Sequence, residues 1–492
     1  MRCAARASIL QAYWRPSAAQ GVRRICRGHG RNTATDRMRE AATSAHASGE
    51  RGAGDGNQHA CNIDSHLSKE GQARNLSSLS KFIFSFLGIP GMVSLHGGLP
   101  NASIFPFKSM KVELQDGTWL DMSETEKMDA AQQYNTNGRG YPPLLEWAKQ
   151  NAQQLHAPPA RQEVVITSGN NHAIDMVLCC LLNRGDSLLC DEYTYSHLVE
   201  AMVGPKGYRA LPVPMDDFGM TPEALEQTIE DLKAKGQPLP RVLYLVPNGQ
   251  NPVSYVAPLE RRQALYQTSR KYDLMIVEDD PYFFLQFPHN REVPGLWNMG
   301  RSYMSLDTDG RVVRLDSFAK FLAPGFRLGW LTAHPHFVDK FTYHMHGTAL
   351  GPCSTTQVML AELVQHWGSA GLDRHLKSLQ TVYKRRALLM HTAAKQHLEG
   401  LASWLPPEAG MFMWLKLEGG VKDADDIIDA LKDEQVAVVP GRISHCNGPR
   451  PPFPCPFVRL SFAMAPEEDI PKGIERLANV LKRVQNKSDR GH

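Results

Sequence analysis

The sequence predicts an α/β protein: a large domain with a mainly parallel β-sheet flanked by helices, followed by a smaller C-terminal α/β domain. Three observations lead to this prediction. Short apolar runs recur along the chain, stretches with helical spacing of apolar residues separate them, and a polar cluster follows each run. Such continuous runs are typical of parallel strands buried on both faces. They lie at residues 164–167, 242–246, 274–277 and 311–315.

The smaller domain is predicted over residues 351–492. Apolar residues at helical spacing predict a C-terminal helix that packs on a core, and the acidic residues Asp423, Asp425 and Asp426 are typical of a helix start. Short strands are expected near residues 411–417, 436–439 and 457–462. The apolar stripe of the helix consists of Ile470, Ile474, Leu477, Leu481 and Val484.

Composition is that of an ordinary globular protein. A chain of 492 residues is too long for a single core and favours two domains. The 54 Lys and Arg nearly balance the 51 Asp and Glu, so the charge gives no reason to expect nucleic acid or an acidic membrane surface as a partner. The nine cysteines lack metal-ligand spacing, so we expect free thiols and no metal. No apolar run is long enough to cross a bilayer.

The N-terminus differs in kind from the rest of the chain. Seven arginines precede the first acidic residue, Asp36, and apolar residues lie among them. This pattern is typical of a transit peptide, which we assign to residues 1–35, for a mitochondrion or a plastid. The alternative is a basic disordered tail on a cytoplasmic protein. We expect an unstructured linker over 36–75, an arm that closes the site over 76–106, and the large domain over 107–350.

The fourth apolar run leads into a lysine and an arginine. Lys320 follows the run by a few residues, and Arg327 follows a Pro-Gly turn. A lysine reacts with an aldehyde only as the neutral amine, and burial beside other cations lowers its pKa from about 10.4. Arg327 and Ser317, together with the helix start at 168–171, would form an anion site suited to a phosphate.

Polar residues at two other strand ends complete the cluster. Asp279 could keep a ring nitrogen protonated, and Tyr282 and Asn251 could reach a ring hydroxyl. Each alone is more often part of a turn, a helix cap or packing than of a binding site. Because ligands of open α/β sheets bind outside the carboxyl ends of the strands, we expect all of these groups to line one crevice.

The motifs at these positions resemble those of the class I/II aminotransferases that use pyridoxal phosphate (fold type I). The resemblance extends from about Ser94 to the C-terminus, and is strongest to the kynurenine/2-aminoadipate and aromatic aminotransferases. It is carried by the segments at 94–101, 105–107, 167–169, 246–252, 276–282, 316–320, 327–329, 409–414 and 458–462.

This resemblance implies a role for each matching residue. Lys320 is the Schiff-base lysine and the acid/base, Asp279 pairs with the ring nitrogen, and Tyr282 and Asn251 bind the ring hydroxyl. Arg459 holds the substrate α-carboxylate. The alternation in the segment 457–462, with Val458, Leu460 and Phe462 on one face, supports a separate environment for Arg459. The remaining implied cofactor ligands are Asn170, Asn171, Ser317 and Arg327 at the phosphate, Tyr195 on the ring, and Tyr134 from a dimer partner; Gly98 and Leu99 line the substrate pocket with Asn251.

The resemblance implies an enzyme: a homodimeric transaminase that moves an amino group from an aromatic amino acid, kynurenine or 2-aminoadipate to 2-oxoglutarate by a ping-pong mechanism. Its partners are amino acids and 2-oxo acids. Two departures are notable: Ser254 stands where glycine is usual, and Ala319 where serine is common. The alternatives are another fold-type I enzyme, such as a lyase or decarboxylase, and a cofactor-sensing regulatory domain.

Overall fold

The computed structural model describes residues 61–86, 98–134, 138–448 and 454–490, together with the single residues 89, 93 and 95. The predicted transit peptide, the linker up to residue 60 and part of the predicted arm lie outside the described residues. Nothing in the structure tests the predicted domain boundaries, which remain a prediction.

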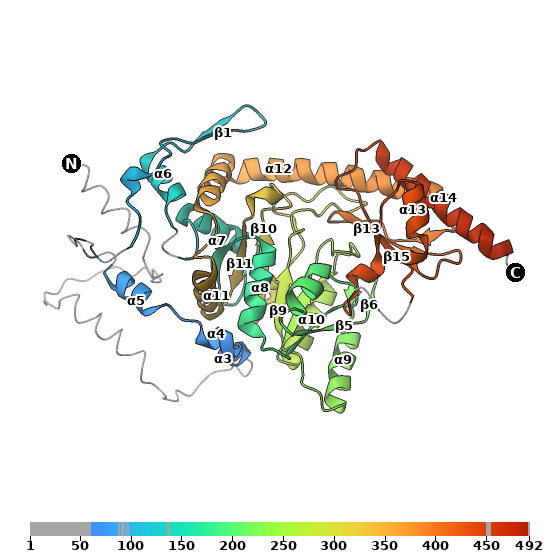
Figure 1. The fold of residues 1–492 in the computed structure, drawn as a ribbon, viewed down its shortest axis with the longest axis horizontal. Helices are drawn as coiled ribbons and strands as arrows, with labels where there is room; N and C mark the ends of the chain where they lie inside the picture. The colour runs from blue at the N-terminus through green and yellow to red at the C-terminus, as the bar shows by residue number, and fades with distance from the viewer. Residues whose placement is uncertain are drawn as a thin grey trace. The chain divides into compact units, whose positions relative to one another are not determined.

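A seven-stranded sheet forms the centre of the described chain (Figure 1). Six of its strands are mutually parallel, and β11 is antiparallel to both of its neighbours, β3 and β10. All four apolar runs are strands of this sheet, so the predicted mainly parallel sheet is confirmed. In spatial order the strands are β3 (Glu163–Thr167), β11 (Gly329–Ala333), β10 (Val312–Ser317), β9 (Met275–Asp279), β8 (Val242–Leu245), β4 (Ser187–Asp191) and β5 (Arg209–Val213).

Helices cover both faces of this sheet. Successive residues of β3 show this, because Val165 packs in one apolar core while Val164 and Ile166 pack in another. One core contains residues of α8 (Asn170–Leu181) and α11 (Pro335–Thr348). On the other face lie α7 (Pro142–His156), α9 (Pro222–Ala234) and α10 (Leu259–Lys271). Smaller elements are the π-helix η2 (Leu198–Val203), η3 (Met304–Leu306), η4 (Pro324–Phe326), β6 (Met215–Asp216) and β7 (Gly219–Met220).

A second, antiparallel sheet lies in the C-terminal part: β12 (Ala402–Ser403), β13 (Phe412–Leu417), β15 (Phe457–Ser461) and β14 (Val439–Pro440). The predicted strand at 436–439 was misplaced, since only Val439 and Pro440 pair with β15. The predicted helix is α14 (Asp469–Arg490), and its stripe packs into the core as expected. Asp423, the predicted helix start, caps the short helix η5 (Ala424–Ile427), which α13 (Ile428–Asp433) follows directly. The short helix η6 (Gly441–Ser444) comes later in the chain.

The long helix α12 (Ser354–His397) connects the two parts of the fold. It contacts α6 (Thr125–Gln132) and α7 near one end and α14 near the other, and its helical backbone is interrupted at Gly368. Earlier in the chain are α5 (Ser78–Ser85), η1 (Ala102–Ile104), β1 (Lys111–Glu113) and β2 (Trp119–Asp121), and β2 also contacts α12. Within the described residues, no helix combines the length and apolar character needed to span a membrane.

The last residues of the segment predicted as an unstructured linker have helical structure. Residues 63–73 form α3 (Ile63–His66) and α4 (Lys69–Ala73), which pack on the core. Leu67 is buried, and the hydroxyl of Ser68 donates to the carbonyl of Cys179 at 2.6 Å. A Cβ on Gly71 would lie 2.3 Å from the carbonyl oxygen of Cys180, so only glycine allows this close approach. A composition rich in small polar residues concealed these few specific contacts.

Candidate active site

The carboxyl ends of β3, β8, β9 and β10 meet at one crevice, as the parallel topology requires. The crevice contains a cavity of about 270 Å³. Most of the predicted site residues line it, together with Val246, Pro281, Ala319, Pro324 and Phe412. The predicted residues in the lining are Asn170, Asn171, Tyr195, Asn251, Asp279, Tyr282, Ser317, Lys320 and Arg327.

Lys320 lies just beyond β10, with its ammonium 5.9 Å from the centre of the Tyr282 ring. Burial, and then the nearby charge of Arg327, lowers the pKa of this lysine below its ordinary value. Among the described residues, no carboxylate forms an ion pair with it. A desolvated amine without a counter-ion is more readily deprotonated, which is the state that reacts with an aldehyde.

Asp279 is the last residue of β9 and is buried. One carboxylate oxygen accepts a hydrogen bond of 2.6 Å from the amide of Asn170, and the other accepts one of 2.6 Å from the hydroxyl of Tyr244. Burial raises the pKa of Asp279 to about 6, and the bonds from Tyr244 and Asn170 oppose that rise. At neutral pH the carboxylate is therefore largely ionised, as a partner for a protonated ring nitrogen must be.

The start of α8 and Arg327 form a cup for an anion. Gly169 precedes the helix with φ of +85°, and a Cβ there would lie 2.9 Å from the guanidinium of Arg327. The first backbone N–H groups of a helix and an arginine are natural phosphate ligands. Ser317 is buried beside them and accepts a hydrogen bond from the backbone N–H of Ala319. The side-chain amide of Asn170 donates to Asp279, and Asn170 is also the first residue of α8, next to this cup.

Tyr195 follows β4 and lines the same cavity. Its hydroxyl donates to the side-chain oxygen of Asn171 at 3.2 Å, and its ring stacks on that of His197. These contacts fix the plane of the tyrosine ring, as a residue that stacks on a planar ligand requires.

Arg459 projects from β15 toward the cavity. Its guanidinium donates to the side-chain oxygen of Asn251 at 2.7 Å and lies 4.3 Å from the centre of the Phe412 ring. Burial lowers its pKa, and its Nε atom is buried without a partner in the described part of the chain. Val458 and Leu460 are buried on the opposite face of the strand, as the alternation predicted.

Two groups near the cavity escaped the sequence reasoning: Tyr244 and Phe412. The predicted substrate residues Gly98 and Leu99 do not line the cavity; Leu99 is 46% exposed. Tyr134 is 57% exposed and likewise lies outside the lining. All three come from segments before the central sheet.

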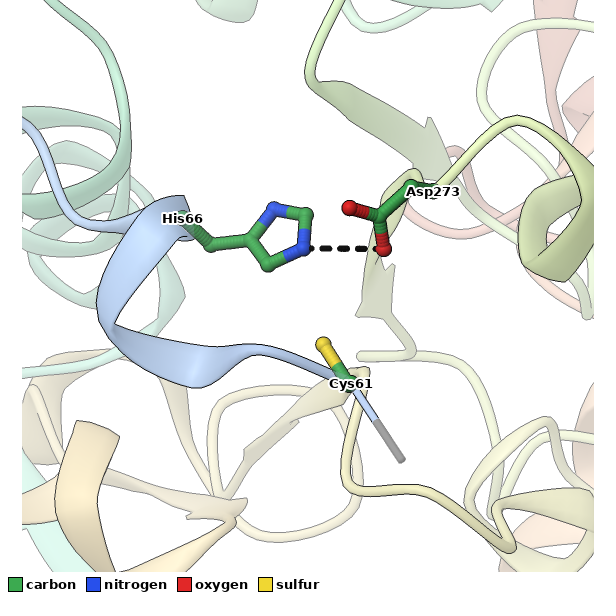
Figure 2. A group of neighbouring side chains, drawn as sticks. All are labelled: Cys61, His66 and Asp273. Atoms are coloured by element: carbon green, nitrogen blue, oxygen red, sulfur yellow. Dashed lines mark hydrogen bonds and ion pairs between the residues drawn. The ribbon is translucent and has the colours of Figure 1, made fainter. Parts of the chain in front are cut away.

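A second cluster of potential ligand atoms lies at the other end of β9. Figure 2 shows Cys61, His66 and Asp273 directed toward one another, with their ligand atoms within 4.8 Å. The imidazole of His66 lies 3.1 Å from one carboxylate oxygen of Asp273, and the guanidinium of Arg311 lies 3.5 Å from the same oxygen. With that oxygen already contacted by two nitrogen groups, we interpret the cluster as the attachment of α3 to the sheet.

The fold and the site together define an enzyme that uses pyridoxal 5′-phosphate. A buried acid at one strand end, a lysine just beyond the next with no carboxylate partner in the described chain, and an anion cup in the same cavity fit the ring nitrogen, aldehyde and phosphate of that cofactor.

The chain belongs to the aminotransferases of class I and II, because the model of that family matches residues 110–477. The mitochondrial kynurenine/alpha-aminoadipate aminotransferase of Rattus norvegicus is 34% identical over 407 residues, which cover 80% of this chain and 92% of the rat protein. An aromatic amino acid aminotransferase of Schizosaccharomyces pombe is 31% identical over 470 residues, covering 85% of this chain and 98% of its own.

Solved structures of aminotransferases also resemble this chain. The aminotransferase Aro8 from Candida albicans matches with a TM-score of 0.79 at 27% identity, over 87% of this chain and 99% of that one. A kynurenine aminotransferase from Pyrococcus horikoshii, determined in complex with PMP, matches with a TM-score of 0.66 at 29% identity, over 86% and 98%. The predicted family, fold class and cofactor are confirmed.

Proposed function

We propose that this aminotransferase moves the amino group of an aromatic amino acid, kynurenine or 2-aminoadipate to 2-oxoglutarate. Its similarity to kynurenine/alpha-aminoadipate and aromatic amino acid aminotransferases supports this range of amino donors. The resemblance of the site motifs to the same branch of the family supports 2-oxoglutarate as the acceptor.

One observation carries the proposal: the cations of the cavity lack counter-ions within the described chain. Lys320, Arg327 and Arg459 form no ion pair with a carboxylate there, although they lie in or beside one small cavity. Elsewhere in the core the reverse holds, since the buried Arg314 contacts three carboxylates, those of Glu278, Asp280 and Asp316. A site with uncompensated positive charge is built to bind anions.

Two anions account for this charge. Arg327 and the start of α8 would hold the cofactor phosphate, and Arg459 would hold the α-carboxylate shared by amino acids and 2-oxo acids. Arginine offers two parallel N–H donors that match a carboxylate, and Asn251 and the Phe412 ring keep the guanidinium in one orientation.

The cofactor supplies an aldehyde that condenses with amines and a ring that withdraws electrons. Asp279 would keep a proton on the ring nitrogen, and Tyr282 and Asn251 would hold the ring hydroxyl. The amine of Lys320 would accept the proton from the substrate α-carbon and would later donate a proton back. Because the same groups serve both half-reactions, ping-pong kinetics follow.

We also propose a homodimer in mitochondria. The exposed Tyr134 and Leu99 lie in segments that a second copy would cover, where Tyr134 would reach the phosphate and Gly98 and Leu99 the substrate. The arginine-rich residues 1–35 and the mitochondrial rat relative support the compartment.

A panel of amino donors with 2-oxoglutarate tests the function. Glutamate and the matching 2-oxo acid should form in equal amounts from at least one aromatic donor, kynurenine or 2-aminoadipate. Release of carbon dioxide or ammonia without glutamate would instead indicate a decarboxylase or a lyase.

A further inference from the structure

Two buried cysteines from distant parts of the chain are in contact. The sulfur of Cys190, in β4, lies 3.2 Å from the sulfur of Cys446, which is 256 residues further on. Both side chains are almost completely buried. Within the described part of the chain, this is the one pair of cysteine sulfurs at such a distance. A disulfide requires about 2.0 Å, so the sulfurs need to approach by only about 1 Å.

The backbone around this pair holds the two segments together. The N–H of Cys446 donates to the carbonyl of Glu192 at 2.8 Å, and the N–H of Thr194 donates to the carbonyl of Ser444 at 2.7 Å. Between these bonds, Tyr193 and His445 pair as an antiparallel bridge. The closeness of the sulfurs therefore results from paired backbone on both sides.

Aromatic packing reinforces the seam formed by the paired segments 192–194 and 444–446. The ring of Tyr193 lies 5.3 Å from the rings of both Trp414 and Phe457, which stack on each other in neighbouring strands of the C-terminal sheet. The sulfur pair thus lies where the end of β4 meets the C-terminal sheet.

We propose that Cys190 and Cys446 are a site of reversible oxidation, at which hydrogen peroxide or a similarly small peroxide converts the two thiols to a disulfide. One sulfur attacks a peroxide oxygen, which forms a sulfenic acid and releases water. The second sulfur attacks the first, forms the S–S bond and expels hydroxide, which takes up the remaining thiol proton as water. Two thiols lose two electrons, and one peroxide is reduced to two waters.

Burial decides the fate of the sulfenic acid. The partner sulfur is already in contact, so its effective concentration is far higher than that of any dissolved thiol or second peroxide. The same burial makes the first oxidation slow, because the peroxide reaches the pair only when the seam opens transiently. The disulfide should therefore form slowly but cleanly.

The cross-link would connect the two sides of the candidate active site. Cys190 is followed within five residues by Tyr195 on the cofactor side, whereas Cys446 follows β14, whose Val439 pairs with Arg459. Any effect of the cross-link on turnover rests on the proposed function, because such an effect requires the groups around Tyr195 and Arg459 to move relative to one another in catalysis. Formation of the bond does not depend on that function.

The experiment treats the holoenzyme with hydrogen peroxide, blocks free thiols with an alkylating agent, and maps peptides without reduction. A Cys190–Cys446 peptide should appear, lighter by two hydrogens than its two halves, and should vanish after reduction. The exposed Cys353 reports oxidant delivery through labelling of its sulfenic acid. The oxidised protein should unfold at a temperature higher by about 3–8 °C, since the link closes a long loop.

Cys446→Ala is the matched variant, because alanine keeps a small apolar side chain there. It should retain the turnover of the reduced wild type and lose both the cross-linked peptide and the rise in unfolding temperature. Full alkylation of Cys190 and Cys446 while Cys353 is oxidised would overturn the proposal, as would a link from either residue to another cysteine such as Cys455. If the peptide forms and turnover stays constant, the modification site stands and only the assumed movement is wrong.

Discussion

The hydroxyl of Tyr244 donates a hydrogen bond of 2.6 Å to the carboxylate of Asp279, in the interior of the central sheet. The two residues lie on the neighbouring strands β8 and β9. A phenol that donates to the ionised carboxylate stabilises the charge that a protonated ring nitrogen needs. We therefore propose that Tyr244 acts through Asp279 as a positioning residue.

Tyr244→Phe removes this bond without leaving a large cavity. Losing a hydrogen bond to a charged group should raise the pKa of Asp279 above about 6, by about one unit. The acidic limb of the pH profile of kcat/KM should then move to higher pH by a similar amount, because Asp279 must be ionised to act. Activity should fall most below neutral pH.

Tyr266→Phe is the matched control. Tyr266 is also buried and contacts a buried aspartate, Asp307, at 3.2 Å, but it lies outside the cavity. Its loss should cost stability and leave the pH profile unchanged. A Tyr244→Phe enzyme with the wild-type profile would show that the bond does not tune the site.

Asp279→Asn should separate stability from function. Burial raises the pKa of Asp279 in the folded protein to about 6, above the ordinary 3.8. The folded apoprotein therefore binds a proton that the unfolded chain has released, so its stability falls as pH rises through this interval and stays lower above it. The full loss in the free energy of unfolding is about 3 kcal/mol.

The asparagine variant avoids that cost. Denaturant unfolding of the apoprotein should show a free energy of unfolding above that of the wild type at pH ~8, by up to about 3 kcal/mol, and little difference at pH ~4. Turnover should be almost lost, because a neutral amide does not stabilise a charged ring nitrogen. A variant that is less stable at both pH values would contradict the burial cost.

Gly169→Ala should weaken cofactor binding. Alanine at φ of +85° is strained, and its Cβ would lie 2.9 Å from the guanidinium of Arg327, which would have to leave the anion cup. We expect the dissociation constant of pyridoxal phosphate to rise about tenfold or more.

Gly117→Ala is a control at a similar φ. Its φ is +82°, and a Cβ there meets nothing within 4 Å. Both variants should lose stability, by about 1 kcal/mol or more, but only Gly169→Ala should release the cofactor more readily. Equal cofactor affinity in the two variants would argue against the anion cup.

Arg459→Lys keeps the charge but loses the paired N–H donors and the planar contact with Phe412. The KM for both the amino donor and 2-oxoglutarate should rise about tenfold or more, because both carry the same α-carboxylate. Arg385→Lys, at an exposed arginine paired with Glu467, should leave KM unchanged. A rise in KM for only one of the two substrates would mean that Arg459 does not hold the common carboxylate.

Sequence alone predicted that residues at the ends of several strands would lie together in one cavity. Lys320, Asp279 and Asn251 each follow an apolar run, and parallel topology brings such ends together whatever the details of packing. Tyr244 and Phe412 were missed for the opposite reason. Tyr244 lies within an apolar run, and the contact of Phe412 with Arg459 depends on the pairing of β13 with β15.

Segments at the start of the chain were less predictable. Two short helices in the expected linker are held by contacts of Leu67, Ser68 and Gly71 that a composition signal does not register. Tyr134 and Leu99 are exposed in a single chain, so the roles proposed for them require a second copy of the chain, which one sequence does not describe.

Reduction of the purified holoenzyme with borohydride, followed by peptide mass spectrometry, tests most directly that Lys320 carries the cofactor. The reagent makes a bond between the lysine nitrogen and the cofactor aldehyde permanent. We predict a phosphopyridoxyl group on the peptide that contains Lys320, and a loss of turnover that parallels its formation. An unmodified Lys320 in a preparation that the same treatment inactivates through another residue would contradict the assignment.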